Sequence, residues 1–267
     1  MNGARLYGRY VGASIRAQMQ YPASFLMLAT GQFTITFVEF IGLWSLFHRF
    51  GQVDGWTIGQ VAVFYGAVSI SFAIADAISR GFDIFGTTFV KTGTFDRLLL
   101  RPRATALQLL GHELRLNSVG RLLQGVLVMA IAAKLSAINW NAANIFLLLA
   151  TVAGGTALFL GIWVLQATLA FWTVESLEIA NTLTYGGVEA AQYPLDIYSR
   201  YFRDFLIFVV PIGCVSYFPV ERLLGHPDRM GAPDWMLAAS PMVGFIFLAV
   251  SLGVWRFGVR HYTSTGS

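Results

Sequence analysis

The sequence predicts an all-α integral membrane protein that crosses the bilayer six times. Hydrophobic residues make up 56% of its 267 positions and charged residues only 12%, about half of the roughly 25% charged content of a soluble domain. The mean hydropathy is +0.62. Six stretches approach the roughly 20 apolar residues that a helix needs to span a bilayer, and they lie near 22–47, 58–79, 119–138, 143–172, 202–221 and 235–257. We therefore expect residues 1–267 to form a single transmembrane domain.

The segment 1–20 is predicted to be an amphipathic helix that lies in the membrane interface and leads into the first span. One face carries Arg5, Arg9 and Arg16 at helical spacing, and the adjacent face carries Leu6, Tyr10, Ala13 and Ala17. Such a helix holds a protein at anionic lipid headgroups. The apolar stretch that follows is too long for the core of a signal peptide, so we expect it to stay in the membrane.

The first span contains a polar stripe. Gln32, Thr36 and Glu39 follow i, i+4, i+7 spacing and share one face of the helix. A charge at mid-span costs roughly 2.5 to 3.5 kcal/mol. One interpretation is a cavity in which Glu39 attracts a lipophilic cation, helped by rings at Phe33, Phe37, Phe40 and Trp44. The other is a protonated Glu39 that hydrogen-bonds a neighbouring helix, and the sequence leaves both open.

Small residues recur at four-residue spacing in two spans. The second span contains Ser69, Ala73 and Ala77, and the fourth contains Ala153, Ala157 and Gly161. Such stripes predict close helix–helix contacts without naming the neighbour. At the inner end of the second span, Asp76 and Arg80 are one turn apart and are expected to pair.

The polar segment 91–103 between the second and third spans is predicted to hold a short docking helix. Thr94 is placed to cap it, Asp96 suits its positive start, and Pro102 ends it. This helix would carry an apolar ridge, formed by Leu98, Leu99 and Leu100 with Arg97 and Arg101 beside it. An apolar ridge that faces water favours a soluble protein partner. The alternative is an interfacial helix that lies on the bilayer.

Two further polar regions flank the later spans. Glu113, Asn117, Arg121 and Gln124 form a helical stripe that either lines a cytoplasmic vestibule or pairs across the bundle. The mixed segment from Thr173 to Arg200 is expected to hold a second cytoplasmic contact helix, with Arg200 and Arg203 at re-entry into the bilayer. Pro211 and Gly213 are expected to kink the fifth span, and Tyr217-Phe218-Pro219 to end it at the outer interface.

The basic residues predict the orientation of the spans. If the N-terminus is cytoplasmic, fourteen of the 18 Lys and Arg residues fall inside, and Arg49, Lys134, Arg222 and Arg229 fall outside. Cytoplasmic loops carry the basic excess, so we expect both termini in the cytoplasm. This orientation also accounts for the net charge of +4, and no clustered basic domain predicts binding to nucleic acid.

Catalytic and metal-binding motifs are missing from the sequence. Cys214 is the single cysteine, and the four histidines are far apart, which excludes a disulfide framework and the usual zinc-ligand spacings. There is no G-x-S-x-G elbow and no P-loop that could hold nucleotide phosphates. We therefore predict no catalytic residue, no metal ligand and no cofactor in this chain, and any ATP must be bound by another chain.

Several motifs resemble one family of membrane proteins. They are the segment Phe95-Asp-Arg-Leu-Leu-Leu-Arg-Pro102, the pairs Tyr193-Pro194 and Ile197-Tyr198, the element Pro211 with Tyr217-Phe218-Pro219 and Leu223-Leu-Gly225, and the tail with Trp255, Gly258, Tyr262, Ser264 and Gly266-Ser267. With six spans and an N-terminal interfacial helix, the chain resembles the permease subunit of an ABC-2 type exporter. The motifs are similar to those of the small bacterial ABC-2 permeases grouped with viologen-type exporters.

The resemblance implies partners as well as a fold. It implies a dimer of permeases in the bacterial inner membrane, with a related second permease favoured over a second copy of the same chain. It also implies cytosolic ABC ATPase subunits that bind ATP and Mg. Phe95 to Arg101 would be the coupling helix, and the docking residues would be Thr94, Phe95, Asp96, Arg97, Leu98, Leu99 and Arg101.

The expected function is ATP-driven export of amphiphilic or cationic small molecules from the cytoplasm. The residues expected along the translocation pathway are Gln32, Thr36, Glu39, Trp44, Asn117 and Gln124. One alternative is an ABC-2 permease that exports a lipid or a glycan-linked molecule. Another is a membrane scaffold that recruits an ATPase without transporting anything.

Overall fold

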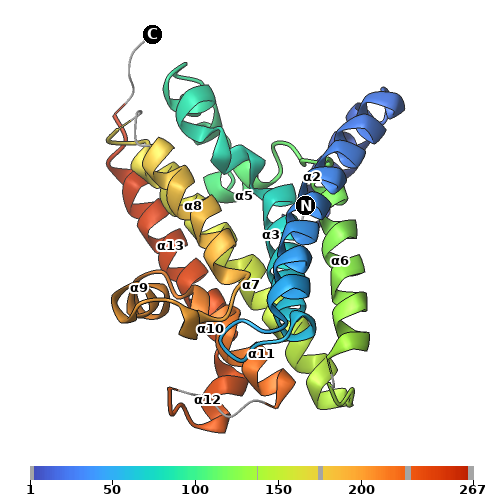
Figure 1. The fold of residues 1–267 in the computed structure, drawn as a ribbon. Coiled ribbons are helices and arrows are strands. Elements are labelled where there is room, and N and C mark those ends of the chain that lie inside the picture. Colours follow the sequence, from blue (N-terminus) through green and yellow to red (C-terminus); the bar gives the residue numbers. More distant parts are fainter. Residues whose placement is uncertain (1–2, 137, 174–176, 226–229, 264–267) are drawn as a thin grey trace.

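The computed structural model describes residues 3–136, 138–173, 177–225 and 230–263. Arg229 and the tail residues from Ser264 to Ser267 lie outside these ranges. The described chain is a bundle of helices (Figure 1). Five of the helices are long and apolar enough to cross a membrane: α2 (Pro22–Phe50), α3 (Ile58–Asp83), α6 (Ser118–Leu135), α7 (Ala142–Leu169) and α13 (Met242–Arg260). They correspond to the predicted first four spans and the sixth.

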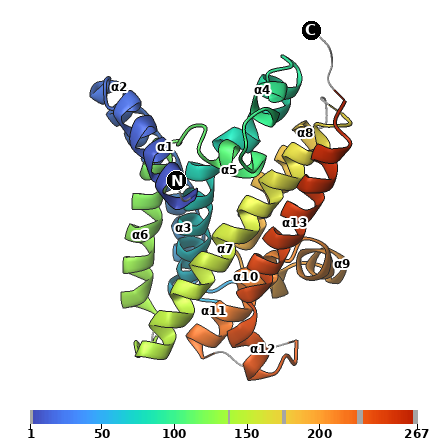
Figure 2. The ribbon, with the colours of Figure 1, turned by 180° about the vertical axis from the view of Figure 1, so that it is seen from behind.

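The two ends of the bundle carry different short elements (Figures 1 and 2). At one end, called here the α4 end, α3 continues into the π-helical turn η1 (Phe85–Val90), then α4 (Phe95–Leu99) and α5 (Thr105–Leu110). At the other, the α11 end, lie α11 (Tyr217–Leu224) and α12 (Asp234–Ala239). The predicted short helix between the second and third spans is thus present, and it projects from the bundle beyond the spans.

The N-terminal helix α1 (Gly3–Gln18) lies at the α4 end, where it packs on the loop before α6. The hydroxyl of Ser14 accepts a hydrogen bond from the Leu114 backbone N–H at 3.0 Å, and the Gln18 amide donates to the Leu114 carbonyl. The ring of Tyr10 lies against Gly111, where a Cβ atom would collide with it. The predicted amphipathic helix is therefore also a packed part of the fold.

The fifth predicted span is wrong. Residues 202–221 do not form one helix, because the segments Arg200–Val209 and Ile212–Leu224 meet at a bend of 73°. The expected kink at Pro211 is confirmed, since Pro lacks the N–H and fixes φ, but the bend is so sharp that the two segments do not form one continuous helix. This pair comprises α9 (Arg200–Asp204), η3 (Phe205–Val209), α10 (Ile212–Val215) and α11.

The chain passes between the two ends in α8 (Leu177–Ala191) instead (Figure 1). The start of α8 lies at the α4 end, and beyond it the turn η2 (Leu195–Ile197) lies at the α11 end, where the Trp56 indole donates to the Asp196 carboxylate at 3.1 Å. The expected cytoplasmic contact helix within Thr173 to Arg200 is thus wrong, because α8 packs against α3, α7 and α10 inside the bundle.

Glycines bring two helix pairs into backbone contact. A Cβ at Gly125 of α6 would touch Ser69 and Ile70 of α3, and a Cβ at Gly161 of α7 would meet Phe247 of α13. The close approach predicted from the small-residue stripes is therefore confirmed for the second and fourth spans, with α6 and α13 as their neighbours. A very tight crossing joins α7 and α13, where a Cβ at Gly244 would collide with the backbone of Gly154.

This crossing can be tested with two identical substitutions in one helix. Gly244→Ala is expected to destabilise the bundle by about 1 to 3 kcal/mol because overpacking forces the backbones apart. Gly253→Ala on the same helix meets no atom within 4 Å, so a gain in helix propensity of up to about 1 kcal/mol should leave it as stable as the parent or more so. Thermal unfolding in detergent, followed by tryptophan fluorescence, measures both. Equal midpoints would show that the contact is not tight.

Candidate functional site

The α4 end presents an apolar ridge with basic neighbours. Leu100 is 85% exposed and Leu99 is 41% exposed, and Arg97 and Arg101 are exposed beside them. Leu98 turns partly inward and packs on the core. The exposed ridge therefore consists of Leu99 and Leu100. Leu98, which the prediction included, does not belong to it.

The start of α4 differs from the prediction. Asp96 lies in the first turn as expected, but the Thr94 hydroxyl does not cap the helix. It donates instead to the carbonyl of Thr88 at 2.9 Å, which ties α4 back to η1. The helix spans only five residues, so tertiary contacts hold it in place and local capping contributes little.

Phe95 is the main tertiary contact, and its predicted place on the docking surface is wrong. Its ring is completely buried in an aromatic cluster formed by Phe82, Phe85, Phe89, Phe95, Phe171, Trp255 and Tyr262. The ring centroids of Phe95 and Phe85 are 5.0 Å apart in an edge-to-face arrangement, as are those of Phe95 and Tyr262. Such pairs stabilise by about 0.5 to 1.5 kcal/mol beyond burial. The cluster joins α4 to the ends of α3, α7 and α13.

A charge network fixes the loop before α6 to the end of α3. Arg115 donates to Asp76 at 2.6 Å and to Asp83 at 2.7 Å, and Asp76 also accepts from the Ser118 hydroxyl. The expected Asp76–Arg80 pair is wrong, because Arg80 pairs with Asp83 at 2.9 Å. Burial lowers the pKa of the Arg115 guanidinium, but the two carboxylates raise it more, so its pKa lies above the usual value and it stays charged.

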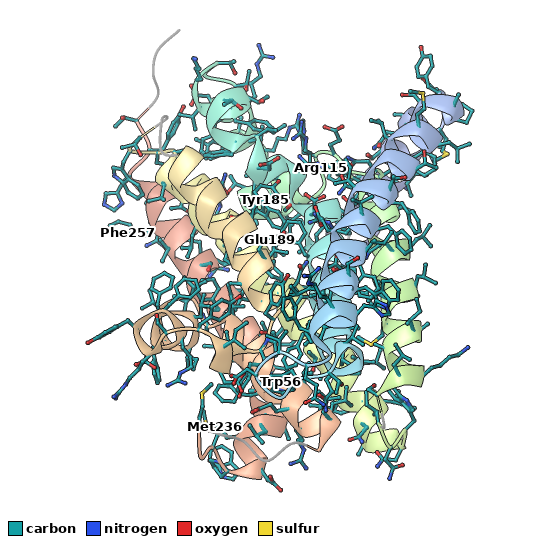
Figure 3. The ribbon with its side chains drawn as sticks, viewed as in Figure 1. Trp56, Arg115, Tyr185, Glu189, Met236 and Phe257 are labelled. Atoms are coloured by element: carbon teal, nitrogen blue, oxygen red, sulfur yellow. The ribbon has the colours of Figure 1, made fainter. Side chains whose placement is uncertain are left out.

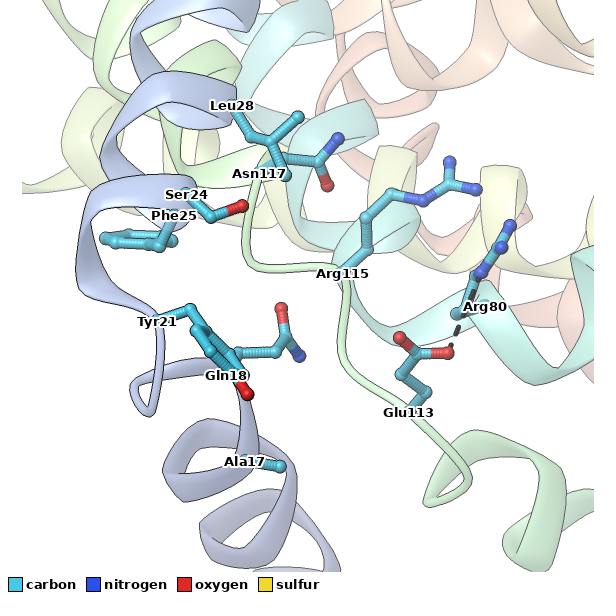
Figure 4. A pocket seen from close by; sticks show the side chains of 10 residues that line it. All are labelled: Ala17, Gln18, Tyr21, Ser24, Phe25, Leu28, Arg80, Glu113, Arg115 and Asn117. Carbon is cyan, nitrogen blue, oxygen red and sulfur yellow. Dashed lines mark ion pairs between the residues drawn. The ribbon is translucent and has the colours of Figure 1, made fainter.

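A cavity of about 550 Å³ lies beside this network, between α1, the start of α2 and the loop before α6 (Figure 4). Polar side chains line it on the loop side, including Glu113, Arg115 and Asn117, while Phe25 and Leu28 line it from α2. A second cavity, of about 80 Å³, lies deeper, and Gln32, Asn117 and Arg121 are among its lining residues. Two of the predicted pathway residues therefore line these polar cavities: Asn117 lines both, and Gln32 lines the smaller one.

Two other predicted pathway residues point elsewhere. Thr36 is buried, and its hydroxyl donates to carbonyls of its own helix, at Gln32 and Phe33. Trp44 stacks on His48 and lines an apolar groove with Phe37, on the side of α2 that faces α6. Neither side chain is among those that line the two polar cavities, and a role of either residue in the pathway stays a prediction. Helical rotation places the rings of Phe37 and Trp44 away from the Glu39 side of α2.

Glu39 is exposed on α2, Glu189 is exposed on α8, and Arg121 of α6 is partly buried. The three residues are called here the charge cluster, and no ion pair joins them among the described residues. In Figure 3, Arg115, Tyr185 and Glu189 follow one another from the α4 end toward the middle of the bundle. Glu189 was missed as a site residue because the prediction placed it in a cytoplasmic helix. The sequence did contain a signal for it, since Glu189 is a carboxylate within an apolar run, two residues after Gly187.

The remaining predicted residue, Gln124, lies fully buried behind this cluster. Its amide is next to the Tyr65 hydroxyl, but neither its nitrogen nor its oxygen meets hydrogen-bond geometry with a described residue. The Tyr65 hydroxyl donates instead to the Thr36 carbonyl at 2.9 Å. The stripe from Glu113 to Gln124 thus divides between the cavity at the α4 end and the interior of the bundle.

Comparison with known proteins identifies one family. The sequence model described as "ABC-2 family transporter protein" matches residues 33–266. No curated protein and no solved structure matches the chain. The match covers every element described above except α1 and the start of α2, and it leaves the viologen-type group a prediction.

The buried position of Phe95 gives a test that separates packing from surface exposure. Phe95→Ala is expected to destabilise the protein by about 3 to 5 kcal/mol because it empties the centre of the aromatic cluster. Leu100→Ala, on the same segment but almost fully exposed, is expected to change stability by no more than about 0.5 kcal/mol. Detergent thermal melts of both variants measure the difference. If Phe95→Ala melts like the parent, the ring does not hold α4 in place.

Proposed function

The chain belongs to the ABC-2 family of transporter proteins, and from this premise we propose that it is the permease subunit of an ATP-driven exporter of amphiphilic or cationic small molecules. It is a multi-pass membrane permease of an ABC transporter. The exported molecule, the direction of transport and the dimeric state are parts of the proposal. Each rests on a different feature of the structure.

The proposal rests mainly on two carboxylates, Glu39 and Glu189, that are exposed on the surface of the bundle. Glu39 and Glu189 are both exposed on the bundle, on helices α2 and α8. A carboxylate that faced lipid there would be costly, so this face needs water and a protein neighbour. A second permease placed on this face would enclose a wet space between the two subunits. We expect a related permease there in preference to a second copy, and this space is the proposed pathway.

The ridge of Leu99 and Leu100 is the proposed docking surface for the ATPase. An exposed apolar ridge with flanking arginines suits an apolar groove with acidic edges on a soluble protein. That partner would bind ATP and Mg, since this sequence has no nucleotide-binding loop. The aromatic cluster under Phe95 would transmit its movement to α3, α7 and α13.

The proposed orientation places the α4 end and both termini in the cytoplasm of a bacterial cell, with the bundle in the inner membrane. Because α9 lies beyond the end of α8, Arg200 and Arg203 move to the opposite side from the one predicted. Twelve of the 18 Lys and Arg residues then remain on the α4 side. The basic excess still supports this orientation.

Lipid export is the second candidate, and one groove favours it. The groove has a volume of about 200 Å³ and is lined by apolar side chains of α2, α3 and α6, among them Phe37, Trp44 and Ile131. An acyl chain fits such a lining better than a charged molecule does. A scaffold that only recruits an ATPase would need neither this groove nor the charge cluster.

The docking surface can be tested by co-purification. The double variant Leu99→Asp, Leu100→Asp is expected to lose the co-expressed ABC ATPase in mild detergent, because two carboxylates cannot enter an apolar groove without desolvation. The control is Tyr201→Asp, which changes a 90% exposed ring on α9 and should keep the ATPase bound. Both proteins should melt like the parent. An ATPase that stays bound to the double variant would place docking elsewhere.

The transport activity can be tested with the complex in liposomes. An amphiphilic cation is expected to stimulate ATP hydrolysis and to move across the membrane only with ATP, because export couples substrate to nucleotide-driven switching. A partner ATPase that cannot hydrolyse ATP is the control. Stimulation by phospholipid alone would favour the second candidate, and a complex that responds to neither would support the scaffold.

A further inference from the structure

The cavity of about 550 Å³ at the α4 end has one apolar wall and one polar wall. Phe25 and Leu28 form the apolar wall, and Leu28 is 59% exposed on a helix that is apolar enough to span a membrane. Tyr21 precedes that helix, is 72% exposed and also lines the cavity. Tyrosines at the ends of spans lie at the depth of the lipid headgroups. The cavity therefore lies where the headgroup and the acyl chains of a lipid meet.

The polar wall is fixed from both sides. It belongs to the loop before α6, and Ser14 and Gln18 of α1 hold this loop by the backbone of Leu114. On the other side, the Arg115 backbone N–H donates to the Ala77 carbonyl of α3 at 3.0 Å, and the Arg115 side chain forms the charge network described above. Because the loop is held by the protein itself, the cavity is formed before a ligand enters, which favours binding.

Two opposite charges line the cavity next to each other without a hydrogen bond between them (Figure 4). The Arg80 Nε and the Glu113 carboxylate are 3.9 Å apart, which is beyond the roughly 2.7 to 3.2 Å of an N–H···O hydrogen bond. Within the described residues, the Arg80 guanidinium donates through Nη1 alone, to Asp83, and no group donates a hydrogen bond to the Glu113 carboxylate. The pair can therefore still donate to a ligand at Arg80 and accept from it at Glu113.

A ligand that carries both charges suits this pair best. An anion bound at Arg80 would be repelled by Glu113, and a cation bound at Glu113 would be repelled by Arg80. Neutral polar groups lie nearby, since the Ser24 hydroxyl points from α2 toward the loop that carries Asn117 (Figure 4). The volume of about 550 Å³ falls within the roughly 300 to 1,000 Å³ of pockets that hold small molecules.

From this geometry we propose that the cavity binds a zwitterionic phospholipid from the leaflet at the α4 end. The phosphate accepts from Arg80, the ammonium group donates to Glu113, and the acyl chains lie along Phe25 and Leu28. The apolar wall is the reason to assign a lipid and not a water-soluble zwitterion. The bound lipid joins the start of α2 to the loop before α6, and it does so whichever molecule the permease exports.

The test adds lipids to the full-length protein in detergent after its native lipids have been washed away. Phosphatidylethanolamine, which is zwitterionic, is compared with phosphatidylglycerol, which is anionic and carries the same acyl chains. Phosphoethanolamine, the headgroup without acyl chains, is the water-soluble probe. Thermal unfolding followed by tryptophan fluorescence measures stabilisation, and native mass spectrometry of lipid mixtures measures the binding preference.

The parent protein should bind phosphatidylethanolamine about fivefold more tightly than phosphatidylglycerol, the ratio expected from one partly exposed charge pair. Phosphatidylethanolamine should also raise the unfolding midpoint more, because a ligand that binds only the folded state stabilises it. Glu113→Gln should reduce the ratio to about one, since it removes both the acceptor for the ammonium group and the repulsion of an anion. Glu113→Lys should reverse the preference in favour of phosphatidylglycerol.

Asp204→Asn is the matched control. The Asp204 side chain is 46% exposed, against 49% for Glu113, and it pairs with Arg200 of α9 at 3.8 Å. It does not line the cavity, so Asp204→Asn should keep the fivefold preference of the parent. Without added lipid, Glu113→Gln should melt like the parent, because Glu113 accepts no hydrogen bond within the described residues.

Three outcomes would overturn the proposal. Equal binding of the two lipids by the parent, or a preference for phosphatidylglycerol, would show that the headgroup is not recognised as a zwitterion. A preference that survives in Glu113→Gln would place the lipid elsewhere on the protein. Stabilisation by phosphoethanolamine equal to that by the lipid would show that the ligand comes from water. None of these measurements depends on ATP hydrolysis or export, so the proposed function stands or fails separately.

Discussion

The cost of placing a charge in hydrocarbon is the constraint on which the rest of this structure depends. Glu39 and Glu189 are exposed on helices that belong to the membrane-spanning bundle, and a lone permease would present both to lipid. A water-filled space closed by another protein subunit would remove that cost. The proposal of a second permease therefore rests on these two carboxylates, and it does not depend on the size of an apolar interface.

The bundle also connects Glu39 and Glu189 to the α4 end. The aromatic cluster around Phe95 joins α4 to α3, α7 and α13, and the Tyr65 hydroxyl joins α3 to the backbone of α2 at Thr36. A force applied to α4 thus reaches α2 through one long helix and one hydrogen bond. Packed cores switch between discrete arrangements more readily than they deform. Movement at the docking ridge is accordingly expected to move the Glu39 helix as a rigid body.

The sequence allowed prediction of those spans that are set by a local run of apolar residues. It did not allow prediction of contacts between residues that are far apart along the chain. Four spans and the last one were predicted closely because each is a continuous apolar run. Helix α8 was missed because it is short and contains Glu189, so its burial depends on neighbours in α3, α7 and α10.

Phe95 was placed on the surface because Trp255 and Tyr262, which cover it, lie far along the chain. Arg115 displaced Arg80 from Asp76 for the same reason. Gln32 and Asn117, which were predicted from helical spacing, line the polar cavities, whereas the exposed position of Glu189 on α8 could be seen only in the fold.

Charge neutralisation gives a physical link between substrate binding and closure of the pathway. At the α11 end, the Trp56–Asp196 hydrogen bond joins the loop before α3 to the segment after α8, so the two sides of the charged face are already tied there. Removing water from a space lined by carboxylates is costly. In the proposed pathway, a bound cation beside Glu39 and Glu189 would lower that cost, so the space would close more easily when it is filled than when it is empty. ATP-driven switching would then depend on the presence of substrate.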